Sequence, residues 1–342
     1  MKEWKGFQKG VDLGGWFSQC DYTEDRYRNF IREEDFAVIH SWGADHVRIP
    51  VDYDLLEDEA GGFRESGFAH LARALGYCRA NGLNAVIDLH KTAGFSFDPG
   101  ERENGFFDSK KYQERFYRLW EEIAGRFGND PGHIAFELLN EVTEECYMPA
   151  WNRIAAECIR RIRAHAPETP VLVGGYWHNS ALSIKAIDIP DDEHLVYNFH
   201  CYEPLIFTHQ GAYWMPSMDR AFRISITADF GTMEKASTEM LGPHLSGLGQ
   251  YPEETLLSAG YFIRFFAEAA EAADKRGVPL YCGEYGVIDN VPPEQALAWY
   301  RLIHQAFEHY GIGRAAWSYR EMDFGLSDER MDRVRPELIR NL

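Results

Sequence analysis

The sequence predicts an α/β fold, a (β/α)8 TIM barrel with an inserted lid subdomain after strand six. Short apolar, β-branched runs alternate with longer amphipathic segments, as in a sheet of parallel strands covered by helices. The alternation repeats eight times, the number that closes such a barrel. The rival is an open, doubly wound sheet, but no G-x-G-x-x-G motif follows any of the apolar runs, so a nucleotide-binding sheet has little support.

The eight candidate strands are short and rich in Val, Ile, Leu and aromatic residues. They span residues 10–16, 45–50, 84–90, 133–141, 170–175, 194–200, 278–284 and 313–319. Five intervening segments have a helical pattern, and several of them carry apolar residues at helical spacing and end in glycine, as helix C-termini often do. These candidate helices span residues 68–82, 112–128, 148–165, 260–277 and 292–311.

The chain of 342 residues is longer than the roughly 250 that a minimal barrel needs. The extra residues fall at 91–111, after the third strand, and in a longer segment after the sixth. We expect one domain over residues 1–342, with residues 203–256 forming an inserted subdomain over the cleft. That segment has enough aromatic residues to pack locally: Phe207, Tyr213, Trp214, Phe222 and Phe230.

The net charge of −19 disfavours nucleic acids and anionic membranes as partners. The N-terminus has no apolar signal region and no stretch is long enough to span a membrane, so we expect a cytoplasmic protein, or a secreted one if a leader has been removed. The six cysteines form no C-x-x-C pair, so we expect free thiols rather than a zinc site or a disulfide framework.

Polar side chains recur where the predicted strands end. In a barrel of parallel strands these C-terminal ends meet on one face, and that face carries the active site. The residues concerned are Arg48, Asp88, His90, Asn140, Glu141, His200, Tyr202, Glu284 and the indole of Trp317.

Glu141 and Glu284 are the most informative of these residues, because each ends a buried run and the two are far apart in sequence. Two carboxylates across a barrel mouth, with amide, imidazole, phenol and indole groups around them, suit glycoside hydrolysis. Glu137 lies deeper in the fourth strand, so we interpret it as a structural carboxylate that needs a cation such as Arg48.

Two other functions stay open from the residues alone. A metal hydrolase would use His and Asp at strand ends, although the first strand has no H-x-H and the histidines are dispersed in sequence. A carbohydrate-binding barrel without catalysis would keep the aromatic residues, but it would not need both Glu141 and Glu284.

The order GVDLGGW, HVRIP, DLH, LLNE, FHCYEP, CGEYG and AWSY resembles glycoside hydrolase family 5, in the clan of retaining (β/α)8 glycosidases, nearly from end to end. Within that family the chain is most similar to clostridial endo-β-1,4-glucanases that lack a signal peptide and carry an extra subdomain after strand six. Those relatives tend to have a second His after His90, where this chain has Lys91.

The resemblance implies Glu141 as acid/base and Glu284 as nucleophile. It implies a supporting, substrate-binding set of Arg48, His90, Asn140, His200, Tyr202 and Trp317, with Trp214 from the inserted subdomain. It also implies a monomer without cofactor or metal that cleaves β-1,4-glucosidic bonds in cellulose-type or mixed-linkage β-glucans. Glucomannan or mannan, and exo rather than endo attack, stay open.

The resemblance further implies double displacement with retention, for which the two carboxylates should lie about 5 to 5.5 Å apart. Glu284 must then be ionised while Glu141 is protonated. We expect burial and nearby negative charge to raise the pKa of Glu141.

Overall fold

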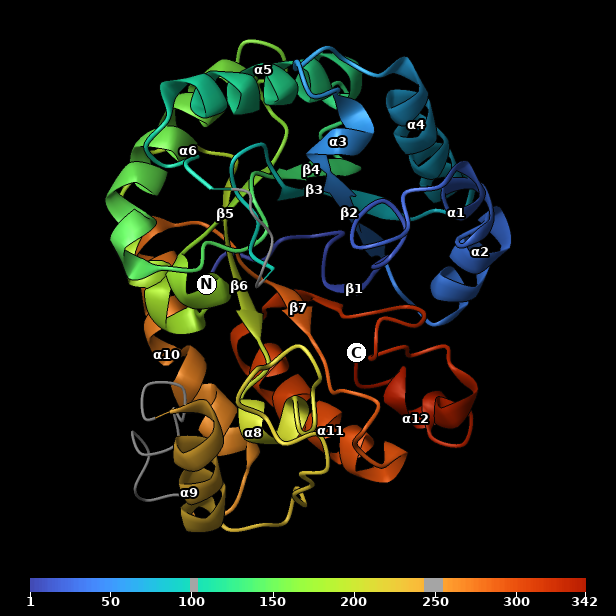
Figure 1. Ribbon diagram of the computed structural model, residues 1–342, viewed down its shortest axis with the longest axis vertical. Helices are drawn as coiled ribbons and strands as arrows, with labels where there is room; N and C mark the ends of the chain where they lie inside the picture. The colour runs from blue at the N-terminus through green and yellow to red at the C-terminus, as the bar shows by residue number, and fades with distance from the viewer. Residues whose placement is uncertain (99–103, 243–254) are drawn as a thin grey trace.

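The computed structural model describes residues 1–98, 104–242 and 255–342. Its eight strands are all parallel and close into a barrel in sequence order (Figure 1). The strands are β1 (Lys9–Asp12), β2 (His46–Asp52), β3 (Asn84–Lys91), β4 (Ile134–Glu137), β5 (Val171–Gly174), β6 (Leu195–Cys201), β7 (Leu280–Tyr285) and β8 (Gly313–Ala316). All eight predicted strands are therefore present, and the predicted barrel is confirmed.

The helices surround the strands (Figure 1). All five predicted helices are present, as α4 (Glu65–Ala80), α5 (Lys110–Phe127), α6 (Met148–Ile162), α10 (Ala259–Arg276) and α11 (Pro293–Tyr310). Further helices are α1 (Glu24–Asn29), α2 (Glu33–Ser41), α3 (Tyr53–Leu56), α7 (Tyr176–Asn179), α8 (Leu205–Thr208), α9 (Phe230–Leu241) and α12 (Arg335–Leu338), with short 3₁₀ helices at Glu145–Tyr147, Ala181–Ala186 and Glu329–Met331.

The connection between β5 and β6 departs from the predicted alternation, because it contains the single turn α7 and a 3₁₀ helix instead of a full helix. Helix α10, which follows β6, packs against that 3₁₀ helix and takes up the space beside it. Trp177, His178 and Asn179 in α7 have φ angles of 51°, 53° and 56°, a left-handed run that is uncommon outside glycine.

Strand β4 ends earlier than predicted, at Glu137 instead of residue 141. Glu137 forms the last pair with β5, opposite Leu172, and the chain then leaves that neighbour. It stays beside β3 through the bond from the Asn140 N–H to the Leu89 carbonyl, at 3.2 Å. Asn140 and Glu141 therefore lie just beyond the strand, on the face where the strands end.

The bottom of the barrel is filled by apolar side chains that face inward. Trp4 and Phe7 precede β1 and stack on each other at 4.1 Å, and Trp4 contacts the edge of the Tyr281 ring at 5.1 Å. The other members of this cluster are Val86, Ala135, Leu172, Val196 and Ala315, contributed by strands β3, β4, β5, β6 and β8. We call this apolar cluster the plug. His46, on β2, lies beside it, with its ring 5.3 Å from Phe7 and its Nε2 2.7 Å from the Tyr281 hydroxyl.

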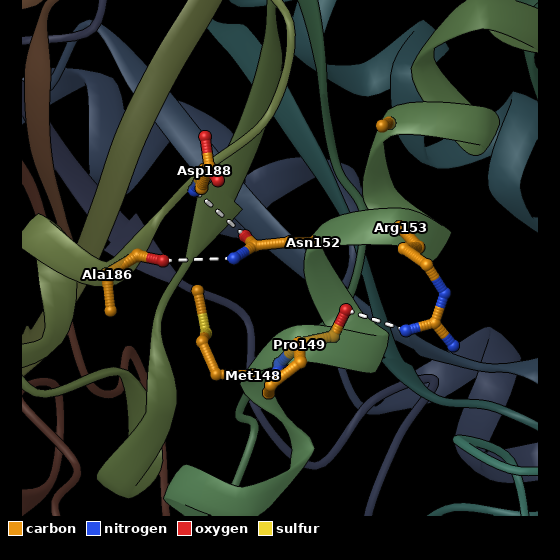
Figure 2. Close-up of a pocket in the computed structure, with 7 residues that line it drawn as sticks. Met148, Pro149, Asn152, Arg153, Ala186 and Asp188 are labelled. Carbon is orange, nitrogen blue, oxygen red and sulfur yellow. Dashed lines mark hydrogen bonds between the residues drawn. The ribbon is translucent and has the colours of Figure 1, made fainter.

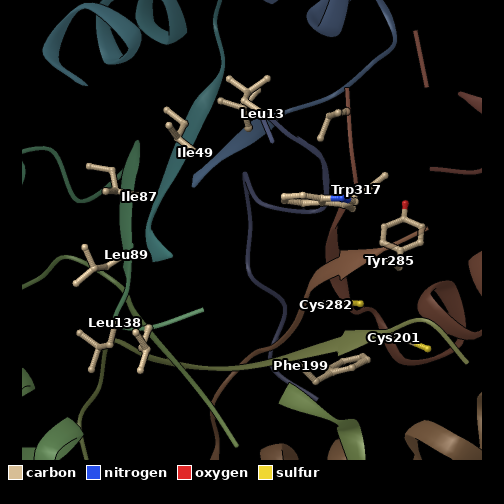
Figure 3. Packing of buried hydrophobic residues seen from close by; sticks show 14 of the residues in the cluster. Leu13, Ile49, Ile87, Leu89, Leu138, Phe199, Cys201, Cys282, Tyr285 and Trp317 are labelled. Atoms are coloured by element: carbon tan, nitrogen blue, oxygen red, sulfur yellow. The ribbon is translucent and has the colours of Figure 1, made fainter. Parts of the chain in front are cut away.

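The outer faces of the strands pack against the helices. Figure 3 shows Ile87, Leu89, Phe199 and Tyr285 pointing away from the middle of the ring of strands, while Trp317 extends toward it. These four outward residues are all at most 1% exposed. The alternation along each strand thus separates a helix-facing apolar set from an inward set that reaches the site.

The segment between β6 and α10 contains α8 and α9, and α9 lies at the edge of the molecule near α10 (Figure 1). The predicted subdomain 203–256 includes residues 243–254, which lie outside the described residues, as do residues 99–103 of the other insertion. Its position over the cleft stays a prediction. The six cysteines are free, as predicted. Among the described residues, no helix has the length and apolar character to cross a membrane.

Candidate active site

Arg48, on β2, is completely buried and organises the floor of the site. Its guanidinium binds Glu137 through two atoms, at 2.6 and 2.8 Å, which confirms the structural partner that we expected for this carboxylate. It also contacts Asp12 at 3.1 Å, Asp88 at 3.0 Å, Asn140 at 2.7 Å and Glu284 at 2.7 Å. Strands β1, β2, β3, β4 and β7 are thereby tied together at one point.

One guanidinium cannot neutralise four buried carboxylates, so burial favours the protonated form of two of them, Glu137 and Asp12. Burial raises the pKa of Glu137 to about 7 against the opposing pull of Arg48. Burial likewise raises the pKa of Asp12 well above its usual range. Burial lowers the pKa of His90, but the charge of Asp88, whose oxygen lies 2.5 Å from His90 Nδ1, outweighs it and raises the pKa overall.

Glu284, on β7, is held by one donor on each oxygen. Arg48 Nη1 binds Oε1 at 2.7 Å, and the Tyr202 hydroxyl donates to Oε2 at 2.9 Å. The carboxylate is 5% exposed, so it is fixed in place yet open to the cleft. Two charge-assisted bonds of this kind hold an anion in a single orientation.

Glu141, beyond the end of β4, has an imidazole on each oxygen. His200 Nδ1 lies 2.8 Å from Oε1, and His178 Nδ1 lies 2.8 Å from Oε2. His200 is buried on β6, whereas the His178 side chain is 55% exposed. The two oxygens of Glu141 are therefore held from inside the barrel and from its solvent side.

The two carboxylates face each other across His200, whose Nδ1 also lies 3.6 Å from Glu284 Oε2. One oxygen of Glu141 and one of Glu284 lie within 4.8 Å of each other. This close approach of two oxygens agrees with the carboxyl separation of about 5 to 5.5 Å that retention uses, and it favours retention over inversion, where the carboxyls lie about 6.5 to 9.5 Å apart.

The pKa of Glu141 shifts in the direction opposite to our expectation. Burial does raise it, but the charge and hydrogen bond of His178, together with those of His200, outweigh burial and hold the pKa well below its usual range. The expectation rested on burial and nearby negative charge, and His178 was not among the predicted site residues. The neighbouring imidazoles instead favour the ionised form of Glu141.

Two hydrogen bonds, one to the side-chain oxygen and one to the backbone carbonyl, hold Asn140 in place. Its side-chain oxygen accepts from Arg48 at 2.7 Å, and its backbone carbonyl accepts from the Asn179 side chain. Its buried Nδ2 has no hydrogen-bond partner among the residues that the structure describes. A buried amide donor of this kind needs a partner, and a sugar hydroxyl in the cleft would supply one.

His90 and Trp317 form an aromatic wall beside the carboxylates. Their rings are parallel, with 1° between the planes and 5.8 Å between the centroids. Phe97, from the loop after β3, meets the His90 ring edge-on at 4.8 Å. Trp317 is 7% exposed and lies directly after β8, where an indole can present an apolar face to a sugar ring.

Trp214 lies farther out and is partly buried. It contacts His209 at 5.9 Å and Phe324 at 6.2 Å, and both of these rings also contact Tyr202. Trp214 is therefore three contacts away from Glu284, because Tyr202 donates to that carboxylate. The structure brings together all the other predicted site residues, which are Arg48, His90, Asn140, Glu141, His200, Tyr202, Glu284 and Trp317.

Sequence reasoning missed three polar residues of this site: Asp12, His178 and Asn198. Asn198 donates to Glu137 at 2.8 Å and accepts from the Gly283 N–H at 2.9 Å. His178 follows the fifth predicted strand, so the rule of polar residues at strand ends could have found it. Asn198 lies inside β6, and Asp12 lies inside the predicted strand 10–16 although β1 ends at it. A single polar residue within a predicted strand gives little indication of its role.

Glu141, His200 and Glu284 could also hold a metal ion, since each offers one donor atom within 4.8 Å of the others. The three groups are already linked to one another in the structure, by the bonds described above. These three residues follow or end different strands, and they meet here in space.

A groove on the outside of the barrel lies apart from this site, between α6 and the chain leading to β6 (Figure 2). Asn152 spans it, donating to the Ala186 carbonyl at 3.0 Å and accepting from the Asp188 N–H at 3.0 Å. Its lining contains none of the predicted site residues. The groove is a packing feature of the β5–β6 connection.

Residues 7–323 match the family model described as cellulase (glycosyl hydrolase family 5). Cellodextrinase A of Ruminococcus flavefaciens is 46% identical over 314 residues, which are 92% of this chain and 86% of that protein. Endoglucanase C of Acetivibrio thermocellus is 34% identical over 338 residues, 97% of each chain.

Two solved structures share the fold at low sequence identity. Thermotoga maritima Cel5A in complex with cellobiose has a TM-score of 0.78 at 21% identity, over 98% of this chain and 97% of that one. The cellulose synthase subunit Z of Clostridioides difficile has a TM-score of 0.76 at 22% identity, over 98% and 99%.

Proposed function

The chain belongs to glycosyl hydrolase family 5, and we propose that it is a retaining endo-β-1,4-glucanase acting on cello-oligosaccharides and on cellulose-type or mixed-linkage β-glucans. The observation that carries the proposal is the separation of the two carboxylates, with oxygens of Glu141 and Glu284 within 4.8 Å. The family match and the two named relatives support the β-1,4-glucan substrate.

In the first step Glu284 is the nucleophile. Its oxygen attacks the anomeric carbon while the glycosidic C–O bond breaks, and Glu141 gives its proton to the departing oxygen. The products are a glycosyl ester on Glu284, a Glu141 carboxylate and a shorter saccharide whose new hydroxyl carries the proton. Arg48 and Tyr202 keep the attacking carboxylate aligned through their bonds to its two oxygens.

In the second step Glu141 acts as a base. It removes a proton from water, the resulting hydroxide attacks the anomeric carbon, and the ester bond to Glu284 breaks. Two inversions at one carbon give net retention. The imidazoles on Glu141 suit both steps, because they stabilise the carboxylate that forms in the first step and then take part in holding its returning proton.

The remaining site residues bind the sugar in this proposal. Trp317 stacks on the ring at the cleaved bond, with His90 holding the indole plane. The free Nδ2 of Asn140 donates to a ring hydroxyl close to the anomeric carbon, where hydrogen bonds strengthen in the transition state. No metal or cofactor takes part, so a chelator should leave activity unchanged.

Product analysis on cellopentaose, beside xylo-, manno- and laminari-oligosaccharides of equal length, tests the proposal. We expect cleavage of cellopentaose at internal bonds, with β-configured products at early times. Release of single terminal units would make the enzyme exo-acting, and faster cleavage of the mannan series would make it a mannanase. Binding without cleavage would leave a carbohydrate-binding barrel.

A further inference from the structure

His178 contacts the proposed acid/base from the solvent side of the cleft. Its Nδ1 lies 2.8 Å from Glu141 Oε2, while the other oxygen of Glu141 is bound inside the barrel by His200. His200 is also within 3.6 Å of Glu284, so the inner oxygen faces the nucleophile. The outer oxygen lies beside the exposed His178.

His178 is held in a turn whose backbone is unfavourable for its residues. Trp177, His178 and Asn179 all have positive φ, which costs free energy at every residue other than glycine and persists only where the surroundings enforce it. Such runs of strain concentrate at functional positions.

Three bonds fasten this turn to three consecutive residues of the chain that carries the acid. The Asn179 side chain donates to the Asn140 carbonyl, the His178 side chain meets Glu141, and the His178 N–H donates to the Val142 carbonyl at 3.0 Å. The turn after β5 thus fixes both the backbone and the carboxyl of Glu141.

We propose that His178 is a positioning residue for the acid step of the hydrolysis. Its Nδ1–H donates to the outer oxygen of Glu141, aligns the carboxyl with the glycosidic oxygen and stabilises the negative charge that appears when the proton leaves. A carboxyl oxygen can accept this bond whichever of the two oxygens carries the proton, so His178 can stay bound while the proton passes to the departing group.

The electrostatics of the pair support this role. Partial burial lowers the pKa of His178, but the charge and hydrogen bond of Glu141 outweigh it and raise the pKa overall, so the imidazole readily carries the donated hydrogen. The inference rests on the proposed function, because it assigns His178 to one step of that reaction.

Leaving-group dependence separates this role from a structural one. We expect His178→Ala to lower kcat/KM about tenfold on phenyl β-cellobioside, whose leaving group needs a proton. On 2,4-dinitrophenyl β-cellobioside, whose leaving group departs without one, the loss should stay below about twofold. His178→Asn keeps a donor close to the Nδ1 position and tolerates positive φ, so it should recover part of the loss.

The matched control is His40→Gln, which removes an exposed imidazole on α2, a helix that contributes no residue to the site. This variant should leave kcat/KM unchanged on both substrates. Equal losses on the two substrates in His178→Ala, or no loss on the phenyl substrate, would overturn the proposal for His178 alone. A wild-type protein that cleaves neither cellobioside would overturn the proposed function itself.

Discussion

Arg48 shows how one side chain can organise a whole site. Its five N–H groups reach acidic or amide residues from four other strands or strand ends, and the proposed nucleophile Glu284 is one of them. A buried cation with four carboxylates around it is stable only because some of these acids keep their protons, as the raised pKa values of Glu137 and Asp12 indicate.

The roles of Glu141 and Glu284 can be distinguished by azide. Glu141→Ala should still form the glycosyl-enzyme from an aryl glycoside with a good leaving group, and azide should then give the β-glycosyl azide. In Glu284→Ala the cavity lies beneath the anomeric carbon, so azide should attack there directly and give the α-azide. NMR of the products identifies each anomer.

The α-azide from Glu141→Ala and the β-azide from Glu284→Ala would show that the roles of the two residues are reversed. Glu137→Gln is a useful companion variant, since it alters a carboxylate of the same floor that does not face the substrate. It should give no azide product with either configuration.

Glu203 predicts a pH dependence of stability. Burial raises its pKa from 4.5 to about 7, so the folded chain binds more protons than the unfolded chain between these values. Stability must therefore fall as pH rises from about 4.5 to 7. In Glu203→Gln this contribution disappears, and the free energy of unfolding, measured in urea at several pH values, should fall less steeply. If the free energy of unfolding depends on pH equally steeply in Glu203→Gln and in the wild type, the ionisation of Glu203 does not contribute to stability in this range.

At the scale of elements, loops after the strands determine what surrounds the two carboxylates. The turn after β5 brings His178 to Glu141, the loop after β3 brings Phe97 to His90, and the segment after β6 brings Trp214 near Tyr202. The strands themselves contribute the fixed floor. This division is the usual one in barrels, where rigid strands position a site and loops vary it.

Trp214 tests the contribution of the segment after β6. We predict that it stacks on a sugar in the cleft, so Trp214→Ala should raise KM on cellopentaose about threefold to tenfold, the worth of one aromatic contact. The thermal unfolding temperature should change little, because the indole is only partly buried. An unchanged KM together with a lowered unfolding temperature would make Trp214 a packing residue of the inserted segment.

At the scale of the whole molecule, the barrel is layered along its axis. Trp4, Phe7 and the inward apolar residues close the bottom, the floor around Arg48 is charged, and the catalytic pair lies above it. The apolar plug keeps water from the charged floor from below. The residues that stabilise the fold therefore lie at one end of the barrel, and the residues proposed for catalysis lie at the other.

This separation predicts the effect of changes at Trp4. Trp4→Ala should lower the free energy of unfolding by ~3 kcal/mol, because it opens a cavity in the plug. The value of kcat/KM on cellopentaose, measured well below the unfolding temperature, should stay within about twofold of wild type. A large loss of activity in a folded variant would show that the plug transmits its packing to the site.

The barrel, and most of the residues that meet at the candidate active site, could be predicted from the sequence. Strand and helix periodicities are local, so eight apolar runs could be recognised without tertiary information. Parallel strands in a closed barrel end on one face, and this rule alone grouped Arg48, Glu141, His200 and Glu284. It did not locate the end of β4 at Glu137, because that end depends on where the neighbouring strand β5 diverges.

The environment of Glu141 could not be predicted from the sequence, because its neighbours come from distant parts of the chain. Its pKa falls instead of rising because His178 reaches it from a turn after another strand, with backbone angles that no local pattern of Trp, His and Asn predicts. The separation of the two carboxylates was likewise settled by barrel closure and by His200 between them. Such distances depend on contacts between residues far apart in the chain, and electrostatic effects change steeply over these few ångströms.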